Sequence, residues 1–371
     1  MHRMPPCNGV LRLFATMAMW LGNRAGLDGL AGFGGWVLPA RDYFKRADVV
    51  HLHLIQNDAN LSLLSLPMLA RLKPLVWTVH NPWAGTGGCE YSFECDRWLT
   101  GCSPRCPHPR RTSLFQHYTP YLHWRVKRRV YQRADVTLVV ASQWMQDRIE
   151  RSPLLRHFPC HRIPFGIDLE LFKPRSKTEC RRKLGIPLDH KVIAFRDVGF
   201  KYDRFKGMRW LKAALEIYQP EEPVSLLIFQ GGKDFQGMSP KYRVTATGWI
   251  DGEELAIAFS AADVFLMPSI QEAFGLMAVE SMACGVPVVV FEGTALPEVI
   301  RSPRGGLAVP SKDSVALAEA VRRLLDNDNL RSELGRNARQ IAEDEYAFSM
   351  CVQRHISLYK QVIQCHHSGN R

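Results

Sequence analysis

Two glutamates flank the start of a short helical segment in the second half of the chain. Glu272 precedes the run Phe274–Cys284 and Glu280 lies within it. We predict a helix here because proline and glycine punctuate both ends of the run. It opens on Phe274 and Gly275, where the first backbone N–H groups have no helical acceptor and carry the positive end of the helix dipole. A diphosphate would bind there, and the glycine would let it come close.

The two carboxylates indicate what lies on either side of such a diphosphate. Glu272 and Glu280 are eight residues apart, which is roughly 12 Å along a helix. Because carboxylates repel phosphate, we expect them to accept hydrogen bonds from hydroxyl groups, one on a sugar ring and one on a ribose. The implied ligand is a nucleotide-sugar. The alternative interpretation is an ordinary surface helix with two exposed glutamates.

Cations follow Val192–Arg196, the first of five strands predicted in the same half of the chain. The other four are Val224–Gln230, Arg243–Thr247, Val264–Met267 and Val286–Phe291. Arg196 ends this strand, and Lys201 and Lys206-Gly207 come before the next helix. Cations at the carboxyl end of a strand would complete a diphosphate clamp opposite the amides of the helix. Arg196 and Lys206 are our candidates, with Lys201 in reserve.

These residues, taken in order, resemble the retaining glycosyltransferases of family 4, which have the GT-B fold. Glu272-Ala273-Phe274-Gly275-Leu276 with Glu280 matches the E-x7-E signature of that family, and Lys206-Gly207 matches its K-G. The likeness extends back through Ile163–Asp168 to about Asp48. Further matching pieces are Gly248-Trp249-Ile250, Ala262-Asp263-Val264, Ala283–Val288 and Leu296-Pro297-Glu298.

The resemblance implies an α/β protein with two doubly wound parallel-sheet, Rossmann-like domains facing a cleft. We expect an acceptor-side domain over residues 1–170, a nucleotide-sugar domain over 171–345, and a helix over 346–371 that returns to the first domain before a loose tail. The first strand of the family and its Gly-Gly loop have no counterpart before Val10. By resemblance the catalytic residues are Glu272, His80, Arg196 and Lys206. The donor-binding residues are Lys201, Trp249, Ile250, Phe274, Gly275, Leu276 and Glu280.

His80 ends the second of three strands predicted in the first half of the chain, Asp48–His53, Pro74–His80 and Asp135–Ala141. Strands separated by a helical stretch at this spacing predict a parallel sheet, and ligands bind at the carboxyl ends of such strands. The family histidine at this position contacts the donor sugar, although this chain has Asn81 where the family often has Asp. A purely structural histidine is the alternative.

Four cysteines lie close together in a loop expected over residues 85–107, the Cys-rich loop, between a glycine-rich stretch and a proline. Cys89, Cys95, Cys102 and Cys106 have the spacing C-x5-C-x6-C-x3-C. Four thiols could bind a structural zinc ion that cross-links a long loop. The spacing leaves two other readings open, free or redox thiols and disulfides. A similar Cys-rich insert occurs in bacterial family 4 enzymes that build surface polysaccharides.

Charge is unevenly distributed along the 371 residues. Nearly all of the net charge of +12 lies in the first 175 residues, which favours an anionic partner for that half. The basic run Tyr121–Arg133 predicts a helix with an apolar stripe of Leu122, Val126 and Val130 and with Lys127 among the basic residues on its other faces. This helix either lies on anionic lipid or packs on the core with a solvated basic back. Nucleic acid is disfavoured because no recognised binding module accompanies the charge.

No apolar run reaches the length of a membrane span, and ten cysteines favour a reducing compartment.

The sequence therefore predicts a cytoplasmic hexosyltransferase of the EC 2.4 type, peripheral at the inner face of the cytoplasmic membrane. It would move a sugar from a nucleotide-diphosphate-sugar to a glycan acceptor linked to a polyprenyl diphosphate, for capsule, exopolysaccharide or lipopolysaccharide. No cofactor is required beyond the nucleotide-sugar. The alternatives are a noncatalytic nucleotide-sugar-binding subunit of a polysaccharide assembly complex and a nucleotide-sugar epimerase on the same fold.

Overall fold

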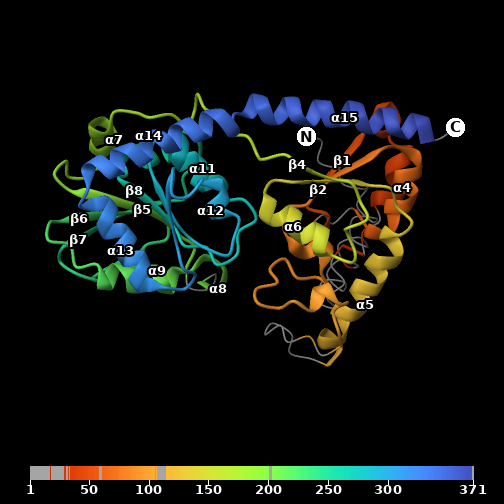
Figure 1. Ribbon diagram of the computed structural model, residues 1–371, viewed down its shortest axis with the longest axis horizontal. Coiled ribbons are helices and arrows are strands. Elements are labelled where there is room, and N and C mark those ends of the chain that lie inside the picture. Colours follow the sequence, from red (N-terminus) through yellow and green to blue (C-terminus); the bar gives the residue numbers. More distant parts are fainter. Residues whose placement is uncertain are drawn as a thin grey trace. The chain divides into compact units, whose positions relative to one another are not determined.

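The computed structural model describes residues 29–30, 32, 34–57, 61–104, 106, 114–199 and 203–369, together with Met17 (Figure 1). The chain divides into two compact units. The first is Met1–Ile163 with Arg354–Arg371, and the second is Pro164–Gln353. The chain thus leaves the first unit slightly before the expected residue 170 and returns to it slightly after the expected residue 345.

The first unit contains a four-stranded sheet in which all neighbours are parallel, in the order β1-β2-β3-β4. The three strands expected from apolar runs are present but shorter than predicted, because their ends already belong to the loops. The fourth strand was not predicted, since its sequence CHR has no apolar run. The strands are β1 (Val50–His53), β2 (Leu75–Thr78), β3 (Thr137–Val140) and β4 (Cys160–Arg162).

Helices flank this sheet. Ser142 caps α6 by accepting a hydrogen bond from the backbone N–H of Met145 at 3.2 Å, as expected for a helix that follows a strand. The described helices of the first unit before the crossing are α2 (Gly34–Val37), α3 (Asp42–Arg46), α4 (Leu66–Leu72), α5 (Leu114–Tyr131) and α6 (Gln143–Arg151), with short 3-10 turns at 38–40, 55–57, 63–65, 82–85 and 97–99.

Helix α5 corrects one expectation about the basic run. Lys127 was placed on the solvated face, but it is fully buried, whereas Leu122 from the predicted apolar stripe is exposed. The Nζ of Lys127 donates to the carbonyl oxygens of Trp83 and, at 3.0 Å, of Thr86, and it lies 3.5 Å from the centre of the Trp83 ring. Because these partners satisfy the ammonium inside the unit, the helix is rotated so that Lys127 faces the core.

The second unit contains a six-stranded parallel sheet in the order β10-β9-β8-β5-β6-β7. Numbered in chain order within the unit and read from β7, this is 3-2-1-4-5-6, the arrangement of dinucleotide-binding folds, with its reversal between β5 and β8. All the predicted strands are present, and β10 is an addition. The strands are β5 (Lys191–Asp197), β6 (Val224–Gln230), β7 (Tyr242–Gly248), β8 (Val264–Met267), β9 (Val288–Phe291) and β10 (Gly306–Val309).

The helices of the second unit pack around this sheet (Figure 1). Asn327 caps α14 by accepting from the N–H of Leu330 at 2.9 Å. The D-x-D sequence Asp326-Asn327-Asp328 therefore ends one helix and begins the next. The helices are α7 (Lys177–Lys183), α8 (Asp203–Lys206), α9 (Met208–Ile217), α10 (Gly252–Ala261), α11 (Leu276–Ala283), α12 (Leu296–Val299), α13 (Ser314–Leu325) and α14 (Asp328–Glu345).

The final helix belongs to both units. α15 runs from Phe348 to Gly369, so the loose tail expected from Cys365 onward is helical as far as Gly369. Its C-terminal part is joined to the first sheet by a hydrogen bond of 2.6 Å between His51 Nδ1 and the Tyr359 hydroxyl. None of the helices in the described part of the chain combines the length and the hydropathy that a bilayer crossing requires.

Candidate functional site

The predicted donor residues gather where the strand order of the second sheet reverses. Arg196 stands near the carboxyl end of β5, and the segment with Glu272 and Gly275 follows β8, its neighbour in the sheet. The crevice outside the carboxyl ends of the strands at such a reversal is the place where open α/β sheets bind ligands. Topology alone therefore brings these two stretches of sequence together.

Gly275 opens helix α11 in a conformation that an L-residue rarely adopts. It is the N-cap with φ 96°, and a Cβ added to it would lie 2.4 Å from Leu296 Cδ2. The helix begins at Leu276, two residues later than predicted. Leu276 is exposed, whereas the side chain of Phe274 is buried and packs edge-on against Phe165. Phe274 therefore anchors the turn in the core, and only its backbone is available to a donor.

Lys206 and Glu272 form the first of two charge pairs around this helix start. The Nζ of Lys206 donates to Glu272 Oε2 at 2.8 Å, and both side chains are partly exposed. Lys206 ends α8, and Gly207 follows it with φ 69°. A Cβ on Gly207 would lie 2.2 Å from the carbonyl oxygen of Pro268. This close approach of two loops holds the lysine beside the glutamate.

Arg196 and Glu280 form the second pair, which is electrostatic and not a direct hydrogen bond. Burial raises the pKa of Glu280 to about 7, and the nearby charge of Arg196 opposes that shift. The guanidinium of Arg196 donates from Nε and Nη2 to Gln230 Oε1 at 3.0 and 2.9 Å. It also lies 4.6 Å from the centre of the Trp249 ring. Trp249 is 67% exposed, so its ring is available to a planar group such as a nucleobase.

Sequence reasoning missed two residues that organise this site. Gln230 holds Arg196 and has φ 81°, in the left-handed region that is rare for residues other than glycine. Asp197 is buried, and its carboxylate accepts from the backbone N–H of Gly199 and of Gly232, both at 2.7 Å. A polar residue at the last position of each neighbouring parallel strand was the available signal.

Lys201, the reserve cation, lies outside the described residues. Ile250 is half-buried beside Trp249.

His80 lies in the first unit, just beyond β2. Its Nε2 is 2.9 Å from His53 Nδ1, and burial together with His53 lowers the pKa of His80 to about 4. His51 is similarly shifted, to a pKa of about 3, mainly by burial, and its Nε2 is 2.7 Å from the Thr78 hydroxyl. These imidazoles are therefore neutral near pH 7. A neutral His80 can donate or accept a hydrogen bond but carries no charge for a phosphate.

The four clustered cysteines form no disulfide in the structure. Burial raises the pKa of the Cys102 thiol to about 11, and its sulfur accepts from the N–H of Gly87 at 3.3 Å. Within the described residues, no three His, Cys, Asp or Glu side chains are arranged to hold a metal ion. The predicted zinc site at Cys89, Cys95, Cys102 and Cys106 thus has no geometric support. The loop is tied down instead by Lys127, through the carbonyls of Trp83 and Thr86.

The two parallel sheets define the class of protein, a two-domain α/β protein of the GT-B type. Comparison with known proteins identifies the family. Residues 23–171 match Glycosyltransferase Family 4, and residues 196–327 match the glycosyl transferases of group 1. The chain belongs to this glycosyltransferase family and is a transferase enzyme.

The relatives are similar to the chain over different lengths. It is 30% identical to the D-inositol 3-phosphate glycosyltransferase of Corynebacterium jeikeium, over 92% of the chain and 79% of the relative. With the enzyme of that name from Corynebacterium glutamicum it shares 31% identity, over 64% of the chain and 60% of the relative. Among solved structures, Anabaena HepE in complex with UDP and glucose has a TM-score of 0.62 at 17% identity, covering 96% of this chain and 84% of that one. The two Corynebacterium enzymes are named for D-inositol 3-phosphate and not for a surface polysaccharide.

Proposed function

We propose that this enzyme transfers a hexose from a nucleotide-diphosphate-sugar to a hydroxyl group of an acceptor, with retention of the anomeric configuration. The observation that carries this proposal is the pairing of each candidate cation with a glutamate around one helix start. Lys206 lies 2.8 Å from Glu272, and Arg196 lies close enough to Glu280 to oppose its pKa shift. The UDP bound to HepE supports a nucleotide-sugar donor.

The geometry indicates what each group would do. Lys206 and Arg196 would stabilise the negative charge that grows on the departing nucleoside diphosphate, next to the amides at the start of α11. Glu272 would orient hydroxyls of the sugar, Glu280 would accept from the ribose, and Trp249 would stack on the base. Because Lys206 is held by Glu272 in this structure, a bound diphosphate must share or replace that contact. His80 would face the donor sugar as a neutral hydrogen-bonding group.

Two classes of acceptor would offer the same functional groups to this enzyme. The family resemblance favours a glycan linked to a polyprenyl diphosphate, destined for capsule, exopolysaccharide or lipopolysaccharide, and the curated relatives are named for D-inositol 3-phosphate. Both carry hydroxyl groups next to phosphate. For the lipid-linked case, α5 offers an exposed face with Tyr118, Leu122, Arg125 and Arg129, and such a face suits an anionic membrane surface at the inner side of the cytoplasmic membrane.

The proposal is tested by incubating the enzyme with a panel of UDP- and GDP-sugars. One arm contains D-inositol 3-phosphate and the other contains a bacterial membrane extract, and products are identified by mass spectrometry. We expect transfer in one arm, with release of nucleoside diphosphate that depends on the acceptor, and NMR should show a retained anomeric centre. Conversion of the donor sugar without acceptor would indicate an epimerase. Donor binding without any turnover would indicate a noncatalytic subunit, and either result would refute the proposal.

A further inference from the structure

A pocket in the first unit lies between the Cys-rich loop and helix α6. Its volume is about 260 Å³. One wall is the loop with Phe93, Cys95 and Trp98, and the other is the face of α6 that carries Trp144 and Arg148. A cavity of this size with aromatic walls and a few charged groups can bind a small polar ligand.

Two arginines of α6 lie against the indole rings of this pocket. The guanidinium of Arg148 is 4.1 Å from the centre of the Trp144 ring and 5.7 Å from that of Trp98. Arg151 lies 5.9 Å from the Trp98 ring. Stacking of this kind holds a guanidinium by its flat face and leaves the N–H groups at its edge for a ligand.

Few of those N–H groups are used within the protein. Arg148 Nη1 donates to the hydroxyl of Ser92 at 3.0 Å. In the described part of the chain, neither Arg148 nor Arg151 forms an ion pair with a carboxylate. Burial, and next the charge of Arg151, lowers the pKa of Arg148 to about 10. Arg148 therefore stays charged at pH 7, and no ion pair within the described residues offsets its charge or that of Arg151.

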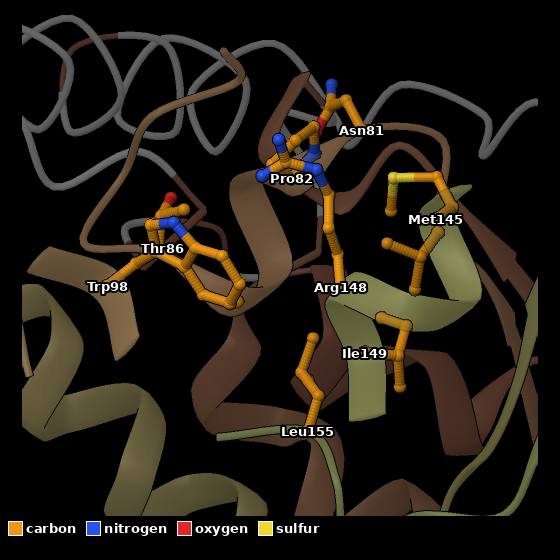
Figure 2. Close-up of a pocket in the computed structure, with 10 residues that line it drawn as sticks. Asn81, Pro82, Thr86, Trp98, Met145, Arg148, Ile149 and Leu155 are labelled. Carbon is orange, nitrogen blue, oxygen red and sulfur yellow. The ribbon is translucent and has the colours of Figure 1, made fainter. Parts of the chain in front are cut away.

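A narrow cavity next to this pocket reaches the carboxyl end of β2, the end of a parallel sheet at which ligands generally bind. Figure 2 shows Arg148 extending from α6 toward Asn81 and Pro82, with Trp98 and Thr86 on the facing loop. Asn81 is the residue after His80, beyond the carboxyl end of β2. Trp98 and Arg148 line both this narrow cavity and the larger pocket, so the two cavities meet at the arginine.

The acids of the pocket lie on its rim. Glu94, Asp96 and Asp147 are exposed, and Asp147 accepts from the side-chain amide of Gln143 at 2.7 Å. Water screens exposed carboxylates more than it screens the half-buried Arg148. These acids would therefore accept hydrogen bonds from hydroxyl groups of a ligand while its anionic group sits deeper, at the arginines.

We propose that this pocket binds the phosphate group of a phosphorylated, polyhydroxylated acceptor. The phosphate contacts the edges of Arg148 and Arg151, and the acceptor ring lies against the tryptophans with its hydroxyls toward the rim. The assignment of the ligand as acceptor rests on the proposed transferase function. The binding itself does not, so it can be tested separately.

Direct binding is measured by titration calorimetry with inorganic phosphate and with D-inositol 3-phosphate, in parallel with unphosphorylated inositol. We expect D-inositol 3-phosphate to bind the wild-type enzyme and inositol to bind at least tenfold more weakly. Arg148→Gln and Arg151→Gln should each weaken binding of the phosphorylated probe at least tenfold, while Arg148→Lys retains part of it. The matched control is Arg156→Gln, an exposed arginine that does not line the pocket. Equal affinity in all variants overturns the proposal.

A second pair of binding assays decides whether the bound phosphate belongs to a free acceptor or to a lipid-linked acceptor. If D-inositol 3-phosphate does not bind, the same variants are tested for retention on vesicles that contain polyprenyl-diphosphate-linked glycan, against vesicles of the same lipids without it. A wild-type enzyme that prefers neither probe overturns the proposal. Loss of transfer in Arg148→Gln with unchanged affinity for nucleoside diphosphate would place the defect at the acceptor. If the wild type transfers no sugar but binds the probe through the arginines, the transferase assignment fails and the pocket stands.

Discussion

Buried or half-buried cations occur in both units, but the groups opposite them differ. In the second unit Lys206 faces Glu272 and Arg196 faces Glu280. In the first unit Lys127 faces backbone carbonyls, and Arg148 faces an indole ring and a hydroxyl. A cation that donates to carbonyls inside a core stabilises the fold, because those hydrogen bonds satisfy polar groups that water cannot reach. A cation held at an exposed edge remains able to exchange its partner for a ligand.

The largest effect should come from Lys206. We expect Lys206→Ala to lower the rate of sugar transfer by about 10³-fold, or about 4 kcal/mol of transition-state stabilisation, because a charge beside the leaving diphosphate is lost. The free energy of unfolding should change by less than about 1 kcal/mol, since the pair with Glu272 is partly exposed. Initial rates and urea titrations measure the two quantities.

The control for this variant is Lys233→Ala, which removes an exposed lysine from the same unit. It should keep the wild-type rate. A Lys206→Ala enzyme as active as this control would show that Lys206 does not face the diphosphate.

Lys127 should show the opposite behaviour. Lys127→Met keeps the length of the side chain but leaves the carbonyls of Trp83 and Thr86 without their donor, so we expect the free energy of unfolding to fall by about 3 kcal/mol. Affinity for nucleoside diphosphate should not change. Arg129→Met on the exposed side of α5 is the matched control and should cost less than about 0.5 kcal/mol. Equal stabilities of the two variants would mean that the buried lysine does not hold the Cys-rich loop.

Gly275 links backbone conformation to ligand binding. Gly275→Ala forces φ 96° on an L-residue and brings a Cβ close to Leu296, so we expect about 2 kcal/mol of destabilisation. We also expect at least tenfold weaker binding of nucleoside diphosphate by calorimetry. Gly185→Ala is the control, because Gly185 also has a positive φ, of 64°, but no atom near its added Cβ. It should lose stability and keep its affinity.

The smallest effect concerns pH. The pKa of Glu280 is raised to about 7 in the folded protein from an ordinary 4.5, so the protonated form is favoured by folding. Its contribution to stability is complete below pH 4.5 and is lost as the pH rises through 7. Ionised Glu280 also repels a diphosphate, so affinity for nucleoside diphosphate should fall severalfold between pH 6 and pH 8. Glu280→Gln should flatten this profile, and an unchanged slope would mean that another group titrates.

Local patterns predicted much of the fold and part of the donor site. β6 and β8 have the bounds expected, since a parallel strand buried on both faces is mostly apolar. Gly275 and Gly207 could be identified because a close ligand or loop leaves room only for glycine there. The short strand β4 could not be predicted, because its residues are polar and only its neighbour β3 fixes it as a strand.

The sequence by itself determined the order of strands and helices, the family motifs, and which cationic and acidic side chains are available to the sites. Only the tertiary structure decided which partner each charge meets. Lys206 and Glu272 are 66 residues apart along the chain, and Lys127 is 44 residues from Trp83. A side chain on a helix can turn toward the core or toward water with little change in the local sequence pattern. The choice for Lys127 and Arg148 therefore depended on carbonyls and rings that only folding brings within reach.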